Sequence, residues 1–197
     1  MTTTVTMERF AEVSPLRKAR IAGAFWLLTI VGGSLALFLH GKLYSVADFI
    51  AGASYVVVTL LLYDMFEPVS RNLSLFAAVL SLAGYTFGRL GLHPKGVDIE
   101  MVFFGFYSLL IGHLIFKSTF LPRILGALMA FAGFAWLTFL SPQVGTYLDP
   151  YNRAAGGIAQ LSLCVWLLVM GVNTERWRER AAARESYASQ ARATPKR

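Results

Sequence analysis

Charged residues and cysteine are scarce in this sequence, and both shortages exclude classes of protein. Only 15% of the 197 residues are charged, whereas a soluble domain carries about 25%. Cys164 is the only cysteine, so the sequence holds no pair for a disulfide or a CxxC metal site. It also lacks a Walker A loop, a GxSxG nucleophile elbow and a glycine-rich dinucleotide-binding loop. We therefore predict no catalytic residue, no cofactor and no metal site, and we expect Cys164 to be a small packing residue.

Long apolar segments are what the sequence has instead. Hydrophobic residues make up 56% of the chain, and the mean hydropathy is +0.56. Each segment is long enough, at about 1.5 Å per residue, to cross a hydrocarbon core of about 30 Å. Because lipid cannot satisfy backbone polar groups and a helix satisfies its own, we predict an all-α membrane bundle of six transmembrane helices. The predicted spans are residues 21–39, 46–65, 72–92, 99–116, 124–140 and 154–172.

The spans divide the chain into three parts. Residues 1–13 are predicted to be a flexible N-terminal segment, and residues 14–173 form the transmembrane domain. Ser14 suits the N-cap of the first helix and Pro15 its first turn. Residues 174–197 form a basic cytosolic tail, whose first half we expect to extend the sixth helix and whose end, including Ser189, we expect to be disordered.

The basic residues predict an orientation. The formal net charge of +7 would suit nucleic acid, but its distribution favours a membrane. If both termini are cytoplasmic, only four of the 18 lysines and arginines lie on the outer side: Lys42, Arg89, Lys95 and Arg153. This bias follows the positive-inside rule. We therefore predict a multi-pass protein with both termini cytoplasmic, no nucleic-acid partner, and a basic tail that contacts anionic lipid headgroups.

Four segments carry a resemblance to a known family. The first helix begins with SPLRKARIAGAFWLLTIVGG, and LLLYDMFEPVSRNLSLFAAVLSL joins the second span to the third. FYSLLIGHLIFKSTFLPRILGALMAFAG joins the fourth to the fifth, and WLLVMGVN ends the sixth. Together these segments, within residues 14–173, resemble the bacterial integral membrane family called domain of unknown function 4386. The resemblance implies a bacterial inner-membrane protein and supplies no catalytic residue.

Ionisable residues near a bilayer are candidate functional groups, because burying them there is costly. Asp48 and Arg89 should lie at similar depth in neighbouring antiparallel helices, so we expect an ion pair. The alternative is an anion-binding pocket that opens to the periplasm. The full set of candidate ligand or polar-pocket residues is His40, Asp48, Arg89, His93, Glu100 and His113.

Metal binding and proton transfer are two further roles considered for these polar residues. His40, His93, Asp98 and Glu100 have donor atoms that suit zinc, but no HxxxH or HExxH spacing accompanies them. His113 lies at membrane depth in the fourth span, where we expect a buried neutral imidazole with a hydrogen-bond partner. The alternative for His113 is a proton relay or a ligand contact, since imidazole titrates near neutrality.

A second polar set lies at the predicted inner ends of the helices. We call it the inner rim, and it consists of Asp64, Glu67, Arg71, Lys117 and Arg123. An ion-pair network that fixes the helix ends would explain it, although exposed pairs contribute only about 0–1 kcal/mol each. The alternative is a docking surface for a cytosolic partner.

Three classes of function are consistent with the sequence. The first is a non-catalytic membrane protein that binds a lipid or a partner, either a second copy or another membrane protein. The second is a small transporter, which we expect to be an oligomer because six helices enclose little space. The third is an intramembrane enzyme acting on a lipid-like substrate. We favour the first, because no catalytic motif is present and the charges gather at the ends of the spans.

Overall fold

The computed structural model describes residues 14–36 and 38–193, and the segments predicted to be flexible at 1–13 and disordered at 194–197 lie outside them. The described residues fold into seven α-helices and two short 3-10 turns, with no β-strand among them. These elements are α2 (Pro15–Ala36), α3 (Gly41–Phe66), α4 (Arg71–Arg89), η1 (Pro94–Gly96), α5 (Ile99–Lys117), α6 (Arg123–Leu137), η2 (Thr138–Leu140), α7 (Pro142–Val169) and α8 (Thr174–Ala193).

Each predicted span overlaps one helix, from α2 to α7, but the bounds differ. The largest difference is at the sixth span, predicted to begin at residue 154, whereas α7 begins at Pro142. Five of these segments are long and apolar enough to cross a membrane: α2, α3, α5, α6 with η2, and α7. Helix α4 is the exception within the described chain, because arginine stands at both of its ends and serines interrupt its apolar residues. The all-helical fold is therefore as expected, and five segments show the apolar character of a membrane span.

The start of the first helix follows the capping prediction. The Ser14 hydroxyl accepts a hydrogen bond from the backbone N–H of Arg17 at 3.3 Å, and Pro15 is the first helical residue. A serine N-cap satisfies one of the free N–H groups at a helix start, and proline has no N–H that would need a partner there. The local sequence therefore fixes where α2 begins.

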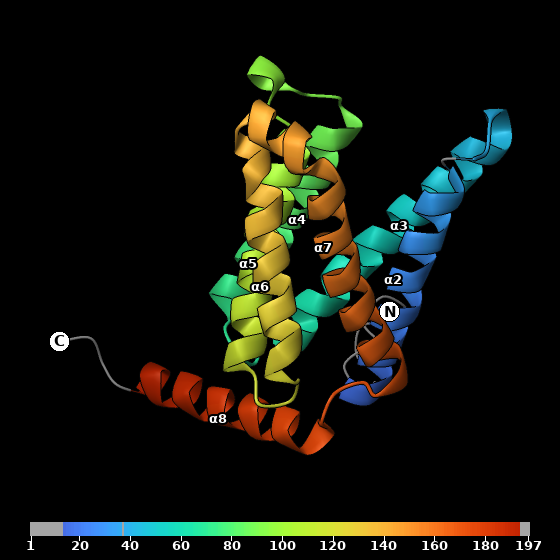
Figure 1. Cartoon of the computed structure of the whole chain (residues 1–197). Coiled ribbons are helices and arrows are strands. Elements are labelled where there is room, and N and C mark those ends of the chain that lie inside the picture. Colours follow the sequence, from blue (N-terminus) through green and yellow to red (C-terminus); the bar gives the residue numbers. More distant parts are fainter. Residues whose placement is uncertain (1–13, 37, 194–197) are drawn as a thin grey trace.

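The helices form a bundle with one diverging arm (Figure 1). Helices α4, α5, α6 and α7 stand side by side, with α5 packed between α4 and α6. Helices α2 and α3 pack on each other as a hairpin, which contacts the rest of the bundle through α7 and α4. The tip of this hairpin leans away from the bundle at the end remote from α8, which we call the far end.

Small residues allow the closest helix contacts. A Cβ atom added to Gly112 of α5 would lie 2.8 Å from the Gly126 carbonyl oxygen of α6, and the contact is reciprocal at 2.9 Å. At Gly23 of α2, an added Cβ would lie 2.6 Å from the backbone nitrogen of Leu168 in α7. Cys164 is fully buried beside that contact, with its thiol 3.4 Å from the Gly23 carbonyl oxygen. The prediction that Cys164 is a packing residue is confirmed.

The C-terminal helix departs from the prediction. We expected it to extend the helix before it, but α7 ends at Val169 and the chain turns at Gly171, which has a φ of 69°. This left-handed conformation suits glycine and ends a helix by its geometry. Helix α8 then runs across the end of the bundle (Figure 1) and includes Ser189, which we had placed in a disordered end.

Candidate functional site

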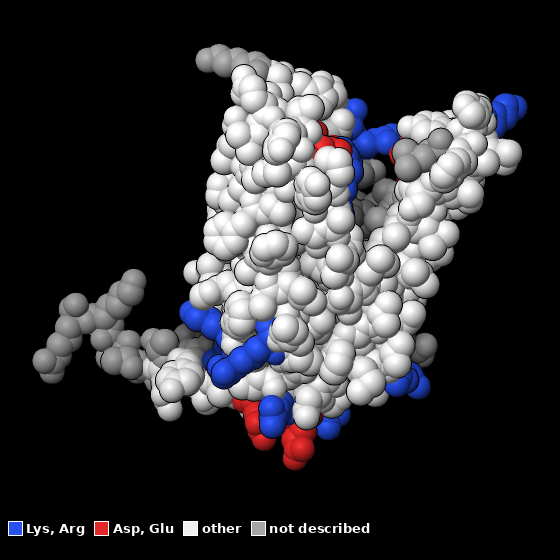
Figure 2. Space-filling view, in the orientation of Figure 1, with Lys and Arg blue, Asp and Glu red and all other residues white. Residues whose placement is uncertain are grey.

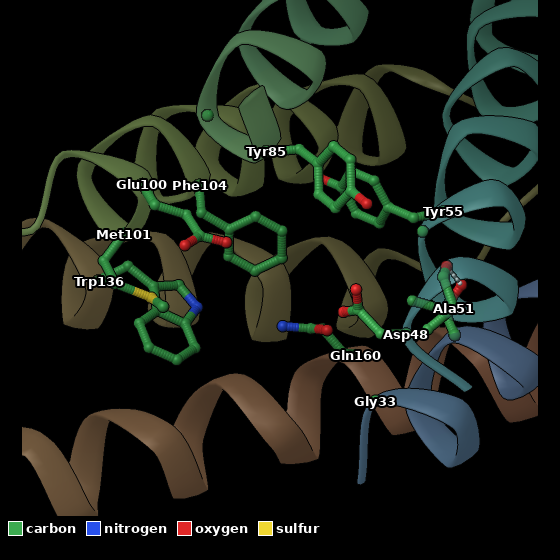
Figure 3. Close-up of a pocket in the computed structure, with 13 residues that line it drawn as sticks. Gly33, Asp48, Ala51, Tyr55, Tyr85, Glu100, Met101, Phe104, Trp136 and Gln160 are labelled. Atoms are coloured by element: carbon green, nitrogen blue, oxygen red, sulfur yellow. Dashed lines mark hydrogen bonds between the residues drawn. The ribbon is translucent and has the colours of Figure 1, made fainter. Parts of the chain in front are cut away.

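A cavity of about 350 Å³ lies where the α2–α3 hairpin meets the rest of the bundle (Figure 3). All six helices from α2 to α7 contribute to its wall. Its volume falls within the range of small-molecule sites, about 300–1,000 Å³. The residues lining it are Thr29, Gly33, Asp48, Ala51, Gly52, Tyr55, Gly84, Tyr85, Glu100, Met101, Phe104, Trp136 and Gln160.

Aromatic rings form much of the wall. The rings of Tyr55 and Tyr85 lie 5.3 Å apart between centroids, and Phe104 meets Trp136 edge to face at 5.9 Å. The Tyr55 hydroxyl is held by Ser81 at 2.6 Å. Contacts with rings at these distances and angles are favourable, so the wall is an ordered set of aromatic faces.

Two glycines make room for these rings. The Tyr85 hydroxyl group lies against Gly52, where a side chain of any size would collide with it. The Trp136 indole lies against Gly156 of α7 in the same way. The position of the aromatic wall therefore depends on glycine at both sites.

The polar groups of the cavity differ in how well they are satisfied. Asp48 forms an ion pair with Arg89 at 2.7 Å, whereas Glu100 takes part in none of the ion pairs within the described residues. The Glu100 carboxylate lies against Gly88, and it points into the cavity in Figure 3. The Trp136 side chain is only 6% exposed, and its indole N–H has no hydrogen-bond partner in the described structure. The cavity thus presents an unpaired carboxylate and a free N–H donor.

The expected Asp48–Arg89 ion pair is confirmed, and it also marks the edge of the cavity. Arg89 lines a second hollow of about 460 Å³, which shares Asp48, Gly52 and Tyr85 with the first. Arg89 is absent from the wall of the first cavity, which presents Asp48 and Glu100. Arg89, the residue that suggested an anion-binding pocket, is therefore paired with the Asp48 carboxylate.

The three histidines lie away from this cavity. His40 precedes α3, and His93 precedes the turn at residues 94–96; both are exposed. His113 was expected to be buried, but its side chain is exposed on α5. It faces outward because the neighbouring Gly112 and Leu114 occupy the buried side. Among the described residues, no three His, Cys, Asp or Glu side chains gather where they could hold a metal ion.

The inner rim is covered in part by the chain's own last helix. Lys18 of α2 pairs with Asp64 at 2.7 Å, and Arg184 of α8 lies 3.2 Å from the Glu67 carboxylate. Glu67 is also 3.8 Å from Arg71. No ion pair of Lys117 or Arg123 is found within the described chain. The expected network is therefore present for part of the rim and includes helix α8.

Helix α8 also caps the helices that end at this level. The Trp177 indole donates to the Met65 carbonyl at 3.0 Å, and Arg184 donates to the Glu67 carbonyl at 2.7 Å, both at the end of α3. At the end of α5, Arg176 donates to the Thr119 carbonyl at 3.1 Å and Arg180 to the Lys117 carbonyl at 3.3 Å. The last carbonyls of a helix lack internal partners and carry partial negative charge, so these donors suit them.

The sequence indicated two of the polar groups in the cavity but missed most of its wall. Asp48 and Glu100 were candidates because they are acidic. Trp136 and Gln160 were not among the candidate residues. A glutamine and a tryptophan within apolar spans could have suggested a polar site. Their positions in the sequence, however, do not show which helices face each other.

Comparison with known proteins agrees with the predicted resemblance. Residues 87–171 match the model of the family described as Domain of unknown function (DUF4386). The matched segment holds the FLPRILG turn and begins near Arg89. The predicted resemblance is therefore confirmed over the end of α4 and the three helices that follow.

A curated protein of Archaeoglobus fulgidus, named only "Uncharacterized protein", is also similar. It is 28% identical over 133 residues, which cover 59% of this chain and 76% of that protein. No solved structure matches the chain. These similarities support an uncharacterised family with membrane-span-like helices and indicate no specific activity.

Proposed function

We propose that this chain is a non-catalytic protein of the bacterial inner membrane that binds a small ligand among its helices. The observation that carries the proposal is the cavity lined by all six helices from α2 to α7. In this proposal α4 is the sixth span. Its polar ends lie near the interfaces, and its apolar middle packs against α3 and α5 on one side and exposes Leu75, Phe76 and Val79 on the other.

The charge distribution supports an orientation with both termini cytoplasmic. Chain order places the start of α2, the loop between α3 and α4, and the α5–α6 loop at the α8 end of the bundle (Figure 1). Arg17, Arg20, Arg71 and Arg123 lie there together with the arginines of α8, and basic side chains gather at this end in Figure 2. By the positive-inside rule this end faces the cytoplasm, and its exposed arginines suit anionic lipid headgroups.

The structure favours a ligand in the cavity over a partner on the inner rim. Helix α8 already supplies Arg184 as the ion-pair partner of the Glu67 carboxylate, and it supplies hydrogen-bond donors to the carbonyls at the ends of α3 and α5. A cytosolic protein that docked on the same groups would have to displace α8. The cavity, in contrast, contains polar groups without partners.

A transporter is the second candidate, and one observation favours it. The α2–α3 hairpin diverges from the bundle at the far end (Figure 1). The ion pair of Asp48 in α3 with Arg89 in α4 connects the two parts. Movement of a hairpin against a bundle around a central site is the usual basis of alternating access. Flux through the purified protein in vesicles would favour this candidate over simple binding.

Native mass spectrometry of the full chain in lipid nanodiscs tests ligand binding. We expect a stoichiometric small molecule on the wild-type protein and its loss in Gly33→Phe, which adds a ring at the cavity wall where an added Cβ meets no other atom. The matched control is Gly157→Phe, since Gly157 also has open space around it but does not line the cavity. A protein that carries only bulk lipid, or a bound molecule unaffected by Gly33→Phe, would contradict the proposal.

A further inference from the structure

The charge balance of the cavity indicates the sign of its ligand. The Asp48 carboxylate is neutralised by Arg89 at 2.7 Å, and Arg89 itself stays outside the cavity wall. Glu100 has no ion-pair partner in the described part of the chain. No lysine or arginine lines the cavity. An unpaired carboxylate is costly in an apolar setting, so the missing charge is a positive one.

The aromatic wall indicates the chemical nature of that cation. Tyr55, Tyr85, Phe104 and Trp136 present four rings to one cavity. Ring faces attract organic cations, most strongly where water is excluded. A bare calcium or magnesium ion would instead need about six or more oxygen ligands, and the described residues bring no three His, Cys, Asp or Glu side chains together that could hold a metal ion. Aromatic faces beside one carboxylate suit an organic ammonium group.

Two uncharged polar groups of the cavity wall also lack hydrogen-bond partners in the part of the chain that the structure describes. The Trp136 indole N–H is buried and has no partner in the described structure, and the Gln160 side chain takes part in no hydrogen bond among the described residues. In Figure 3 both side chains project toward the interior of the cavity from the wall opposite Tyr55 and Tyr85. A buried N–H without a partner is unfavourable. A ligand with a hydroxyl, ether or carbonyl oxygen near its cationic group would satisfy it.

We propose that the cavity binds an organic cation, an amine or quaternary ammonium compound whose charge lies beside Glu100 among the four rings. This inference rests on the proposed function, since it names the ligand class of the same cavity. Glu100 provides the opposite charge, the rings provide the cation–π faces, and the Trp136 N–H donates a hydrogen bond to an oxygen of the ligand. Asp48 and Arg89 form the polar edge of the site.

The test uses benzyltrimethylammonium and its uncharged carbon analogue neopentylbenzene, which has the same shape. Binding of each probe to the full chain in nanodiscs is measured by titration calorimetry and by saturation-transfer NMR. We expect saturable binding of benzyltrimethylammonium, at least tenfold weaker binding of neopentylbenzene, and at least tenfold weaker binding of the cation to Glu100→Gln. Glu179→Gln is the matched control, because Glu179 is exposed on α8 at the other end of the molecule.

The outcomes separate this inference from the proposed function. Equal binding of both probes, or unchanged cation affinity in Glu100→Gln, overturns the organic-cation inference while leaving a ligand cavity, provided that Gly33→Phe abolishes the binding. If neither probe binds, the inference is also overturned. The proposed function is then tested separately by native mass spectrometry of the protein in nanodiscs. Trp136→Phe gives an independent check that keeps an aromatic ring: we expect it to reduce affinity more for choline, which carries an oxygen near its ammonium group, than for benzyltrimethylammonium. An equal reduction for both probes would contradict the hydrogen bond from the Trp136 N–H.

Discussion

Asp48 and Arg89 connect the diverging hairpin to the bundle at the far end. Their charged groups approach to 2.7 Å between α3 and α4, and the two side chains are 24% and 51% exposed. Their position is functional in the proposed scheme, because the pair lies at the shared edge of two hollows. Because both side chains are partly exposed, the contribution of the pair to the stability of the folded protein is expected to be small.

The ion pair is expected to contribute little to the free energy of unfolding. A double-mutant cycle with Asp48→Asn and Arg89→Met should give a coupling energy of about 0.5 kcal/mol, since partly exposed pairs are screened by solvent. Unfolding of the four proteins in mixed detergent provides the measurement. A coupling above about 2 kcal/mol would show a pair far more desolvated than this structure has it.

Gly52→Ala should disturb the cavity wall through Tyr85. The added methyl group collides with the Tyr85 hydroxyl, and forced rearrangement of a packed site costs about 1–3 kcal/mol. The hydroxyl makes the severest clash, and the ring carbon that bears it lies 3.1 Å from the added Cβ. The double variant Gly52→Ala, Tyr85→Phe should therefore recover most of the lost thermal stability. Loss of stability that Tyr85→Phe does not relieve would contradict this packing.

Gly112→Ala should destabilise the protein more than Gly52→Ala. Its added methyl group would lie 2.8 Å from the Gly126 carbonyl and 3.0 Å from the Ala130 nitrogen, both backbone atoms that a rotamer change cannot move. We expect a loss of about 2–3 kcal/mol, measured as the shift of the unfolding transition. Gly157→Ala is the control, because nothing lies within 4 Å of its added Cβ and alanine favours a helix.

Trp177→Phe should loosen α8 without affecting the cavity. It removes the 3.0 Å hydrogen bond to the Met65 carbonyl and leaves a helix-end carbonyl unpaired, at a cost of about 1 kcal/mol. Amide hydrogen exchange within residues 174–193 should become faster, whereas exchange around Glu100 and Phe104, in the part of α5 that lines the cavity, should not change. Tyr187→Phe, on the same helix but 73% exposed, is the matched control and should leave the exchange rates as they are.

Labelling of single cysteines tests the proposed orientation. Cys164 is fully buried, so the wild-type chain should give little background reaction. A membrane-impermeant maleimide added to intact cells should label Tyr147→Cys at the far end and should spare Ser189→Cys in α8. After the cells are lysed, both should react. The opposite pattern would place α8 outside the cytoplasm and contradict the orientation.

Much of the fold could be predicted because its determinants are local. Ser14 and Pro15 set the start of α2, and the apolar segments between polar turns gave one helix for each predicted span. The path after Gly171 could not be read in the same way. Helix α8 turns across the bundle because Trp177 and its arginines find carbonyls at the ends of α3 and α5, and those partners are more than fifty residues away in the sequence.

The candidate site was likewise predictable only in the features that depend on local sequence. Asp48 and Arg89 could be paired from depth alone, since antiparallel neighbours place equivalent positions at one level. His113 was misjudged because depth does not fix which side of α5 a residue faces. Glu100 could be picked out for its charge, but its place beside Phe104 and Trp136 depends on the packing of α5 against α6 through Gly112 and Gly126.

The sequence by itself therefore determined an all-helical chain with membrane-span-like segments, the start of α2, and the concentration of basic residues at one end. These follow from hydropathy, capping and charge, which act over one or two turns of a helix. Only the tertiary structure decided that six helices enclose one cavity, that its rings surround an unpaired Glu100, and that α8 covers the inner rim. Those features depend on how helix faces rotate and cross, which glycine contacts and long-range hydrogen bonds fix only in the folded chain.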